Sequence, residues 1–155
     1  MANLPLQTHN LLTSKKQTIA VAESCTGGLL SSLLTQFSGS SKYFIAGIVT
    51  YSNESKIKLL RIPKYILLEN GAVSEKVARL MAKNIKLITK ADLGIGITGI
   101  AGPTGGSAQK PVGTVFIALA KNKKLICRKF IFKGNRSTIR KQAALKSLYL
   151  LNKTI

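Results

Sequence analysis

The distribution of apolar residues along the chain predicts strands separated by helices. Short runs of β-branched and other apolar residues are typical of buried strands. A short lysine-rich turn joins the last two of these runs, so we expect them to form a hairpin. The five predicted strands cover residues 18–22, 43–51, 93–97, 113–120 and 125–132.

Apolar residues spaced three and four positions apart predict the helices. The clearest amphipathic helix opens at Ser74 and carries apolar residues on one face as far as Ile88. Another is expected to begin with Ser52 as its N-cap, to carry Lys56, and to be closed by Pro63. Further helices are predicted at residues 4–14, 29–38 and 135–151.

Strands that alternate with helices and end in a hairpin indicate an α/β fold. We therefore expect residues 1–155 to form a single-domain three-layer α/β/α sandwich with a mixed, mainly parallel sheet. Ligands of such sheets bind outside the carboxyl ends of the strands. Three polar or glycine-rich segments follow predicted strands, and we expect them to be walls of one cleft: residues 23–28, 51–56 and 98–107.

The chain is strongly basic, with 24 Lys and Arg against 5 Asp and Glu and a net charge of +19. Such a surface attracts anions. The basic residues are scattered and only 6% of residues are aromatic, which favours solvated lysine-rich faces over a nucleic-acid-binding module. That module stays as an alternative. The sequence has no long uncharged apolar stretch and no signal peptide, so we expect a cytoplasmic protein without a membrane anchor.

The scarcity of histidine excludes several mechanisms. The single histidine, His9, lies near the N-terminus, which argues against a Ser-His-Asp triad, a Cys-His pair and a zinc site built from several imidazoles. The two cysteines lie 102 positions apart and are expected to be structural thiols. No metal is expected. The bases that remain for a hydroxyl nucleophile are the lysines, Glu23, Glu54 and Asp92.

Two segments hold the candidate chemistry. Residues 23–28, Glu-Ser-Cys-Thr-Gly-Gly, place hydroxyls, a thiol and backbone N–H groups at a helix N-terminus, which suits an oxyanion but also fits an ordinary helix cap. Lys56 is the best placed lysine base. At its ordinary pKa of about 10.4 it would be neutral about once in a thousand near pH 7, so its pKa must fall by roughly three units. A solvated surface lysine is the alternative role.

Five sequence blocks, in order, resemble the CinA C-terminal-domain family of competence/damage-inducible proteins and nicotinamide mononucleotide deamidases. They are Ala22-Glu-Ser-Cys-Thr-Gly-Gly28, Val49-Thr-Tyr-Ser-Asn-Glu-Ser-Lys56, Gly71-Ala-Val-Ser-Glu75, Gly99-Ile-Ala-Gly-Pro-Thr-Gly-Gly-Ser107 and Lys110-Pro-Val-Gly-Thr-Val115. The resemblance implies an amidohydrolase that converts nicotinamide mononucleotide to nicotinate mononucleotide and ammonia in pyridine-nucleotide salvage. It implies no cofactor, and it places the nucleophile at Ser24 and the base at Lys56.

The remaining site residues are expected around that pair. Backbone N–H groups near Thr26, Gly27 and Gly28, or at Gly99, are candidates for holding the oxyanion. Tyr51 and Asn53 are candidates for orienting the base or the carboxamide. Candidate donors to the substrate phosphate are the glycine-rich loop and two arginines, namely Gly102, Thr104, Gly105, Gly106, Ser107, Arg136 and Arg140.

Several alternatives stay open beside this hypothesis. Cys25 or Thr26 could be the nucleophile in place of Ser24, since a thiolate at a helix N-terminus is reactive. A non-catalytic protein that binds a nucleotide or another phosphate ligand is the rival function. Many members of the family carry aspartate where Thr104 and Asn135 stand, which bears on substrate preference.

The family also has longer members with an N-terminal domain related to molybdopterin-binding proteins. At 155 residues, this chain is expected to lack that domain. We also expect the chain to form a homo-oligomer.

Overall fold

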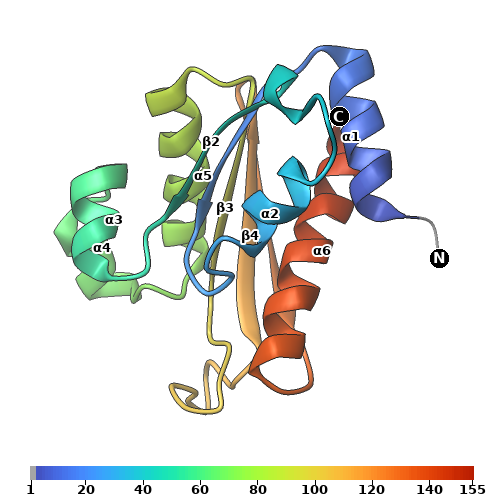
Figure 1. The fold of residues 1–155 in the computed structure, drawn as a ribbon. Helices are drawn as coiled ribbons and strands as arrows, with labels where there is room; N and C mark the ends of the chain where they lie inside the picture. The colour runs from blue at the N-terminus through green and yellow to red at the C-terminus, as the bar shows by residue number, and fades with distance from the viewer. Residues whose placement is uncertain (1–2) are drawn as a thin grey trace.

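A computed structural model describes residues 3–155, which form one five-stranded sheet in the order β2-β1-β3-β4-β5 (Figure 1). The strands β1 (Ile19–Glu23), β2 (Phe44–Val49) and β3 (Leu93–Gly99) are parallel. Next to β3 lies β4 (Thr114–Lys121), which is antiparallel to it, and β5 (Lys124–Ile131) is antiparallel to β4. Only β4 therefore runs against the other strands, and the predicted mixed, mainly parallel sheet is confirmed.

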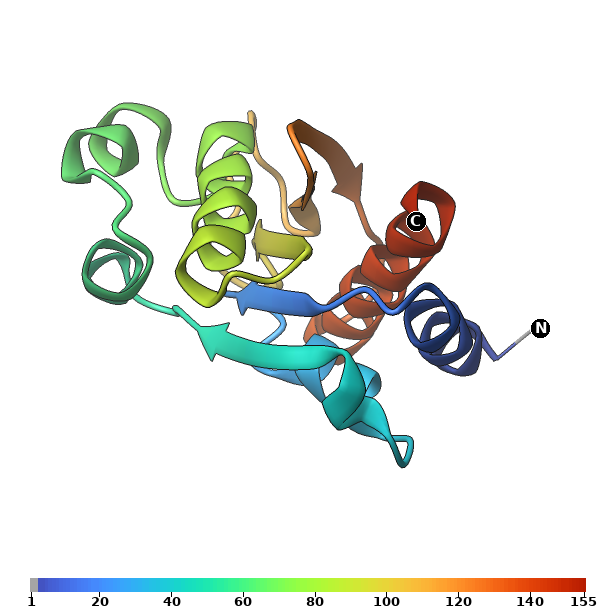
Figure 2. The same ribbon diagram turned by 90° about the horizontal axis from the view of Figure 1, so that it is seen from above.

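Helices cover both faces of the sheet (Figure 2). One face holds α1 (Leu4–Lys15), α2 (Leu29–Thr35) and α6 (Arg136–Thr154), and the other holds α3 (Asn53–Leu60), α4 (Lys64–Asn70) and α5 (Glu75–Thr89). A short 3₁₀ turn, Ser40–Lys42, precedes β2. Within residues 3–155, none of these helices combines the length and the apolar character that crossing a bilayer demands.

The core lies in two layers because strand side chains alternate between the faces. On β1, Ile19 and Val21 pack beneath α1, α2 and α6, whereas Ala20 and Ala22 pack beneath α3, α4 and α5. The long helix α5 lies directly against β3, where a Cβ atom added to Gly96 would stand 2.5 Å from a helix carbonyl oxygen. Glycine on β3 thus lets α5 lie close to the sheet.

Two local predictions differ from the structure. The run at 43–51 was expected to be a buried strand, but β2 is an edge strand whose residues alternate between half-buried and exposed. Pro63 was expected only to close a helix. Instead α3 ends at Leu60, and Pro63 is the N-cap of the additional helix α4, whose Ile66 and Leu67 are buried.

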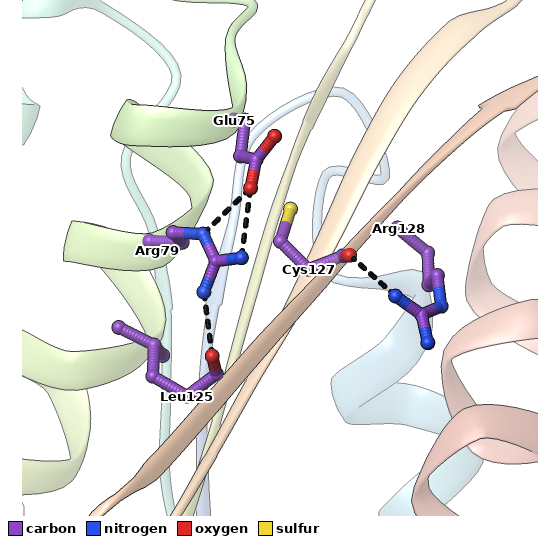
Figure 3. Close-up of polar contacts among 5 residues, drawn as sticks. All are labelled: Glu75, Arg79, Leu125, Cys127 and Arg128. Atoms are coloured by element: carbon purple, nitrogen blue, oxygen red, sulfur yellow. Dashed lines mark hydrogen bonds and ion pairs between the residues drawn. The ribbon is translucent and has the colours of Figure 1, made fainter.

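The other edge strand, β5, is tied to α5 by an arginine (Figure 3). Arg79 forms an ion pair with Glu75 one helical turn away, at 2.7 Å, and donates a hydrogen bond to the Leu125 carbonyl oxygen at 2.5 Å. The neighbouring Cys127 is buried beneath this helix, and burial raises the pKa of its thiol to about 11. This thiol is therefore protonated near neutral pH and packs as a small apolar group.

Candidate active site

The carboxyl ends of β1 and β3 open into a cavity of about 260 Å³. The structure brings the three predicted segments together around it, since each of them contributes to its walls. Eight of the predicted site residues line the cavity: Ser24, Tyr51, Lys56, Gly99, Gly102, Thr104, Gly105 and Arg136. Cys25, the alternative nucleophile, also lines it.

Ser24 and Lys56 face each other in this cavity, with the lysine Nζ 3.1 Å from the serine Oγ. Ser24 directly follows β1, and its N–H donates to the Ile97 carbonyl oxygen of β3 at 3.0 Å, which fixes its backbone to the sheet. Lys56 lies one turn into α3, whose start is capped by the Ser52 side chain. The Lys56 residue is only 1% exposed. Two rigid elements therefore hold the pair in place.

Burial shifts the Lys56 amine towards its neutral form. Burial lowers its pKa to about 8, and the nearby Cys25 opposes this effect. Besides Ser24, the amine donates to the carbonyl oxygens of Thr50 at 2.7 Å and Tyr51 at 3.3 Å. A neutral amine has two N–H bonds and one lone pair. With both N–H bonds directed at these carbonyls, the lone pair is left for the Ser24 hydroxyl.

The carboxylates that the sequence offered as bases are engaged elsewhere. Glu23 is buried and accepts hydrogen bonds from the N–H groups of Gly28, Leu30 and Ser31 and from the Ser31 hydroxyl, at 2.7 to 3.1 Å. Its carboxylate therefore offsets the partial positive charge at the N-terminus of α2. Neither of the other two lines the cavity: Glu54 pairs with Lys58 on the surface, and Asp92 accepts from Thr18 before β3 begins.

The turn that follows Ser24 is held from behind by α6. Gly27 and Gly28 have φ angles of +59° and +99°, which glycine adopts without strain. Arg140 donates from Nε to the Cys25 carbonyl oxygen at 3.1 Å and from Nη2 to the Thr26 carbonyl oxygen at 2.9 Å. Its guanidinium is thus occupied by the turn and does not line the cavity, where it was expected to bind phosphate.

The N–H groups in this turn differ in their availability. The Gly27 N–H donates to the Ser24 carbonyl oxygen at 3.1 Å, and the Gly28 N–H is taken by Glu23. The N–H of Thr26 donates to no backbone oxygen within the part of the chain that the structure describes, and neither does the N–H of Cys25. Because Cys25 follows Ser24, this N–H is the donor best placed for an oxyanion that forms beside the serine.

The Cys25 side chain is in the wrong state for a nucleophile. It is 5% exposed and belongs to the apolar core. Burial raises the pKa of its thiol to about 11, and the charge of Glu23 adds to that effect. A backbone hydrogen bond at Cys25 and the charges of Arg140 and Lys56 oppose it. The reactive thiolate that a helix N-terminus was expected to favour is therefore scarce near neutral pH.

The rim of the cavity carries a positive charge. Arg136 begins α6 and donates to the Gly102 carbonyl oxygen at 2.8 Å and to the Tyr51 hydroxyl at 2.7 Å. Asn135, one of the two departures from the family pattern, caps this helix through a hydrogen bond from the Thr138 N–H at 2.9 Å. An asparagine keeps that cap without adding a negative charge beside the arginine.

The remaining predicted site residues do not line the cavity, namely Thr26, Gly27, Gly28, Asn53, Gly106, Ser107 and Arg140. Ser107 instead braces its own loop, since its hydroxyl accepts from the Lys110 N–H at 3.0 Å. Sequence reasoning missed five lining residues: Ala72, Val73, Thr98, Ile100 and Ala101. A signal existed for all five, because residues 98, 100 and 101 lie in the segment 98–107 that was expected to form a wall of the cleft, and residues 72 and 73 lie within one of the family-like blocks. The Thr98 hydroxyl joins the two groups by donating to the Ala72 carbonyl oxygen at 2.8 Å.

Comparison with known proteins identifies the family. A family model described as the CinA C-terminal domain matches residues 1–155. A CinA-like protein of Syntrophus aciditrophicus is 51% identical over 144 residues, which cover 92% of this chain and 34% of that protein. A CinA-like protein of Leptospira biflexa is 49% identical over 148 residues, or 95% of this chain and 36% of that protein. The chain thus spans about a third of the length of these relatives.

Solved structures agree with the sequence matches. The crystal structure of the competence damage-inducible protein A of Klebsiella pneumoniae superposes with a TM-score of 0.94 at 30% identity, covering 97% of this chain and 94% of that one. A competence or damage-inducible protein of Enterobacter asburiae gives 0.92 at 33% identity, with coverage of 97% and 94%. Fold, sequence blocks and family model coincide, and the chain therefore belongs to the CinA C-terminal domain family.

Proposed function

We propose that this chain is an amidohydrolase that converts nicotinamide mononucleotide to nicotinate mononucleotide and ammonia. The observation that carries the proposal is the buried pair of Ser24 and Lys56, 3.1 Å apart in a cavity at the carboxyl end of the sheet. A serine with a desolvated lysine beside it is an established way to activate a hydroxyl without histidine. The substrate comes from the family resemblance of the five sequence blocks.

In the first half of the proposed reaction, neutral Lys56 takes the proton of Ser24 while Oγ attacks the carboxamide carbon. The N–H of Cys25 stabilises the negative charge that develops on the carbonyl oxygen. The tetrahedral intermediate then collapses, the C–N bond breaks, and Lys56 gives the proton to the departing nitrogen. Ammonia leaves, and an ester joins Ser24 to the nicotinoyl group.

In the second half, water replaces ammonia. Lys56, neutral again, removes a proton from a water molecule that attacks the ester carbon. The same N–H stabilises the second oxyanion. Its collapse returns the lysine-held proton to Ser24 and releases the product as a carboxylic acid, which then loses its proton to the solvent. One water is consumed for each carboxamide, and the serine and lysine end in their starting protonation states.

The rim offers a partner for the substrate phosphate. Arg136 presents its guanidinium beside Gly102 and Tyr51, and an arginine fork matches a phosphate better than a lysine does. The small cavity then receives the nicotinamide ring, while the ribose phosphate remains at the opening near Arg136. Arg140 has a different role in this mechanism, because it holds the turn that carries Cys25.

Comparison of two substrates tests this assignment. Ammonia release is measured from nicotinamide mononucleotide and from nicotinamide riboside, which lacks the phosphate. Arg136→Gln should lower kcat/KM for the mononucleotide by about tenfold or more, the scale of a lost hydrogen bond to a charged group, and leave the riboside nearly unaffected. Arg128→Gln, a change at an exposed arginine outside the cavity, is the charge-matched control. Equal losses on both substrates would remove Arg136 from the phosphate site.

Two expectations about the cellular protein belong to the same proposal. A cytoplasmic location and self-association into a homo-oligomer both stay predictions. Sedimentation of the purified protein measures the second. The non-catalytic rival is favoured if folded wild-type protein binds the mononucleotide and releases no ammonia.

A further inference from the structure

The charges of the chain are divided unevenly along its length. All five acidic residues lie before residue 93, whereas residues 93–155 contain twelve lysines and arginines. In the fold this acid-free part forms β3, β4, β5 and α6 (Figures 1 and 2). The surface that β5 and α6 form on the side of the sheet away from α5 therefore carries basic side chains and no acidic side chain of these two elements, and it attracts polyanions.

A second cavity, of about 620 Å³, opens on this side and shares no residue with the Ser24 cavity. It lies between the start of α1, the end of β5 and one face of α6. The α6 residues Gln142, Leu145, Lys146 and Tyr149 line it because helix positions three and four apart share a face. We call this cavity the β5–α6 groove. Within residues 3–155, its lining contains no acidic side chain.

Aromatic rings gather in the β5–α6 groove although the chain has few of them. Phe130 lies near the end of β5 and Phe132 directly after it, and their rings stack 5.5 Å apart at 14°. Tyr149 faces them from α6 and is 44% exposed. Three of the nine aromatic side chains of the protein thus lie in one groove.

Cations accompany these rings. The Lys146 Nζ lies 5.3 Å from the Phe130 ring centre and 4.6 Å from that of Tyr149. Lys153 approaches the same tyrosine ring, at 5.8 Å. Arg128, two positions before Phe130 and exposed, extends from β5 towards α6 in Figure 3. The groove therefore combines ring faces with positive charges a few ångströms away.

We propose that the β5–α6 groove binds single-stranded nucleic acid. Unpaired bases stack on aromatic faces, and lysine and arginine side chains neutralise the adjoining phosphates, without preference for a particular base. Duplex DNA fits less well because its bases are stacked within the helix. A second copy of this chain is disfavoured as the occupant, since the groove lies on this basic surface of a molecule of charge +19. The proposal does not depend on the amidohydrolase assignment.

Fluorescence anisotropy of a labelled oligothymidylate of about 16 nucleotides tests the groove, with an abasic phosphodiester oligomer of equal length and charge as competitor. We expect the oligothymidylate to bind about fivefold or more tightly than the abasic oligomer, the factor that one stacked base contributes. Tyr149→Ala should weaken binding of the oligothymidylate by a similar factor. Tyr65→Ala, which removes a 59% exposed tyrosine from α4, should not. Ammonia release should be equal in both variants.

Three results would overturn the proposal. Equal affinity for the two oligomers would mean that the groove attracts charge alone. Equal binding by the Tyr149 and Tyr65 variants would place any stacking elsewhere. Failure of wild-type protein to bind, together with a lower sedimenting mass for Tyr149→Ala, would show that a second copy of the chain covers the groove.

Discussion

The Lys56 amine predicts how hydrolysis depends on pH. In the proposed mechanism Lys56 accepts the Ser24 proton only when it is neutral, so kcat/KM should be low when the amine is protonated and should rise as pH passes its pKa. Burial lowers that pKa to about 8. The rate should therefore rise through pH 8 and then level off.

The size of the rise distinguishes a buried lysine from an exposed one. A pKa of about 8 makes the amine about one tenth neutral at pH 7 and about nine tenths neutral at pH 9, so kcat/KM should increase about tenfold. At the ordinary pKa of about 10.4, the neutral fraction would grow about a hundredfold over the same range and reach no plateau. The two cases differ in both amplitude and shape.

Initial rates of ammonia release from nicotinamide mononucleotide, well below KM and at constant ionic strength, measure this profile. The substrate phosphate, whose second pKa is about 6, is already about nine tenths deprotonated at pH 7, so its titration contributes little to the profile. Lys58→Ala, which removes an exposed lysine from the same helix, should keep the wild-type profile. A flat profile from pH 7 to 9, or a continuing hundredfold rise, would refute the role of Lys56 as a desolvated base.

The residues around the pair give three further predictions. Cys25→Ala should retain most of the wild-type kcat, because a thiol with a pKa of about 11 is protonated near neutral pH; a loss as large as that of Ser24→Ala would contradict this. Arg140→Ala should lower kcat about tenfold or more with little change in KM, since it frees the carbonyls of Cys25 and Thr26. Arg140→Lys should recover part of this loss. A raised KM at constant kcat would instead indicate that Arg140 contacts the substrate phosphate. Glu23→Gln should lower the free energy of unfolding by about 2 kcal/mol in urea titrations, because buried N–H groups lose a charged acceptor; a change near zero would contradict this.

Much of the fold could be predicted from the sequence because its signals are local. Ser74 and Asn135 mark helix starts by side-chain capping, and short runs of β-branched and other apolar residues mark the strands. The burial of β2 could not be predicted in the same way. Its sequence resembles a buried strand, but its exposure follows from its place at the sheet edge, which depends on strand order.

The candidate site shows the same division between local and distant information. The blocks around Ser24 and Lys56 indicate strand ends and helix starts, so their meeting at one sheet edge could be expected. The role of Arg140 could not, since it depends on hydrogen bonds to carbonyls more than a hundred residues earlier in the chain. Likewise, the low aromatic content of the chain conceals the clustering of Phe130 and Tyr149, which β5 and α6 bring together.

Ammonia release by four proteins tests the central claim most directly. Wild type, Ser24→Ala, Lys56→Ala and Lys58→Ala are each assayed with nicotinamide mononucleotide in the presence of a chelator, after circular dichroism has shown that they are folded. The Ser24–Lys56 mechanism predicts turnover by wild type and Lys58→Ala, and reduction to the uncatalysed background in the other two. Folded wild-type protein that releases no ammonia, or a Ser24→Ala variant that keeps near-normal turnover, would contradict it.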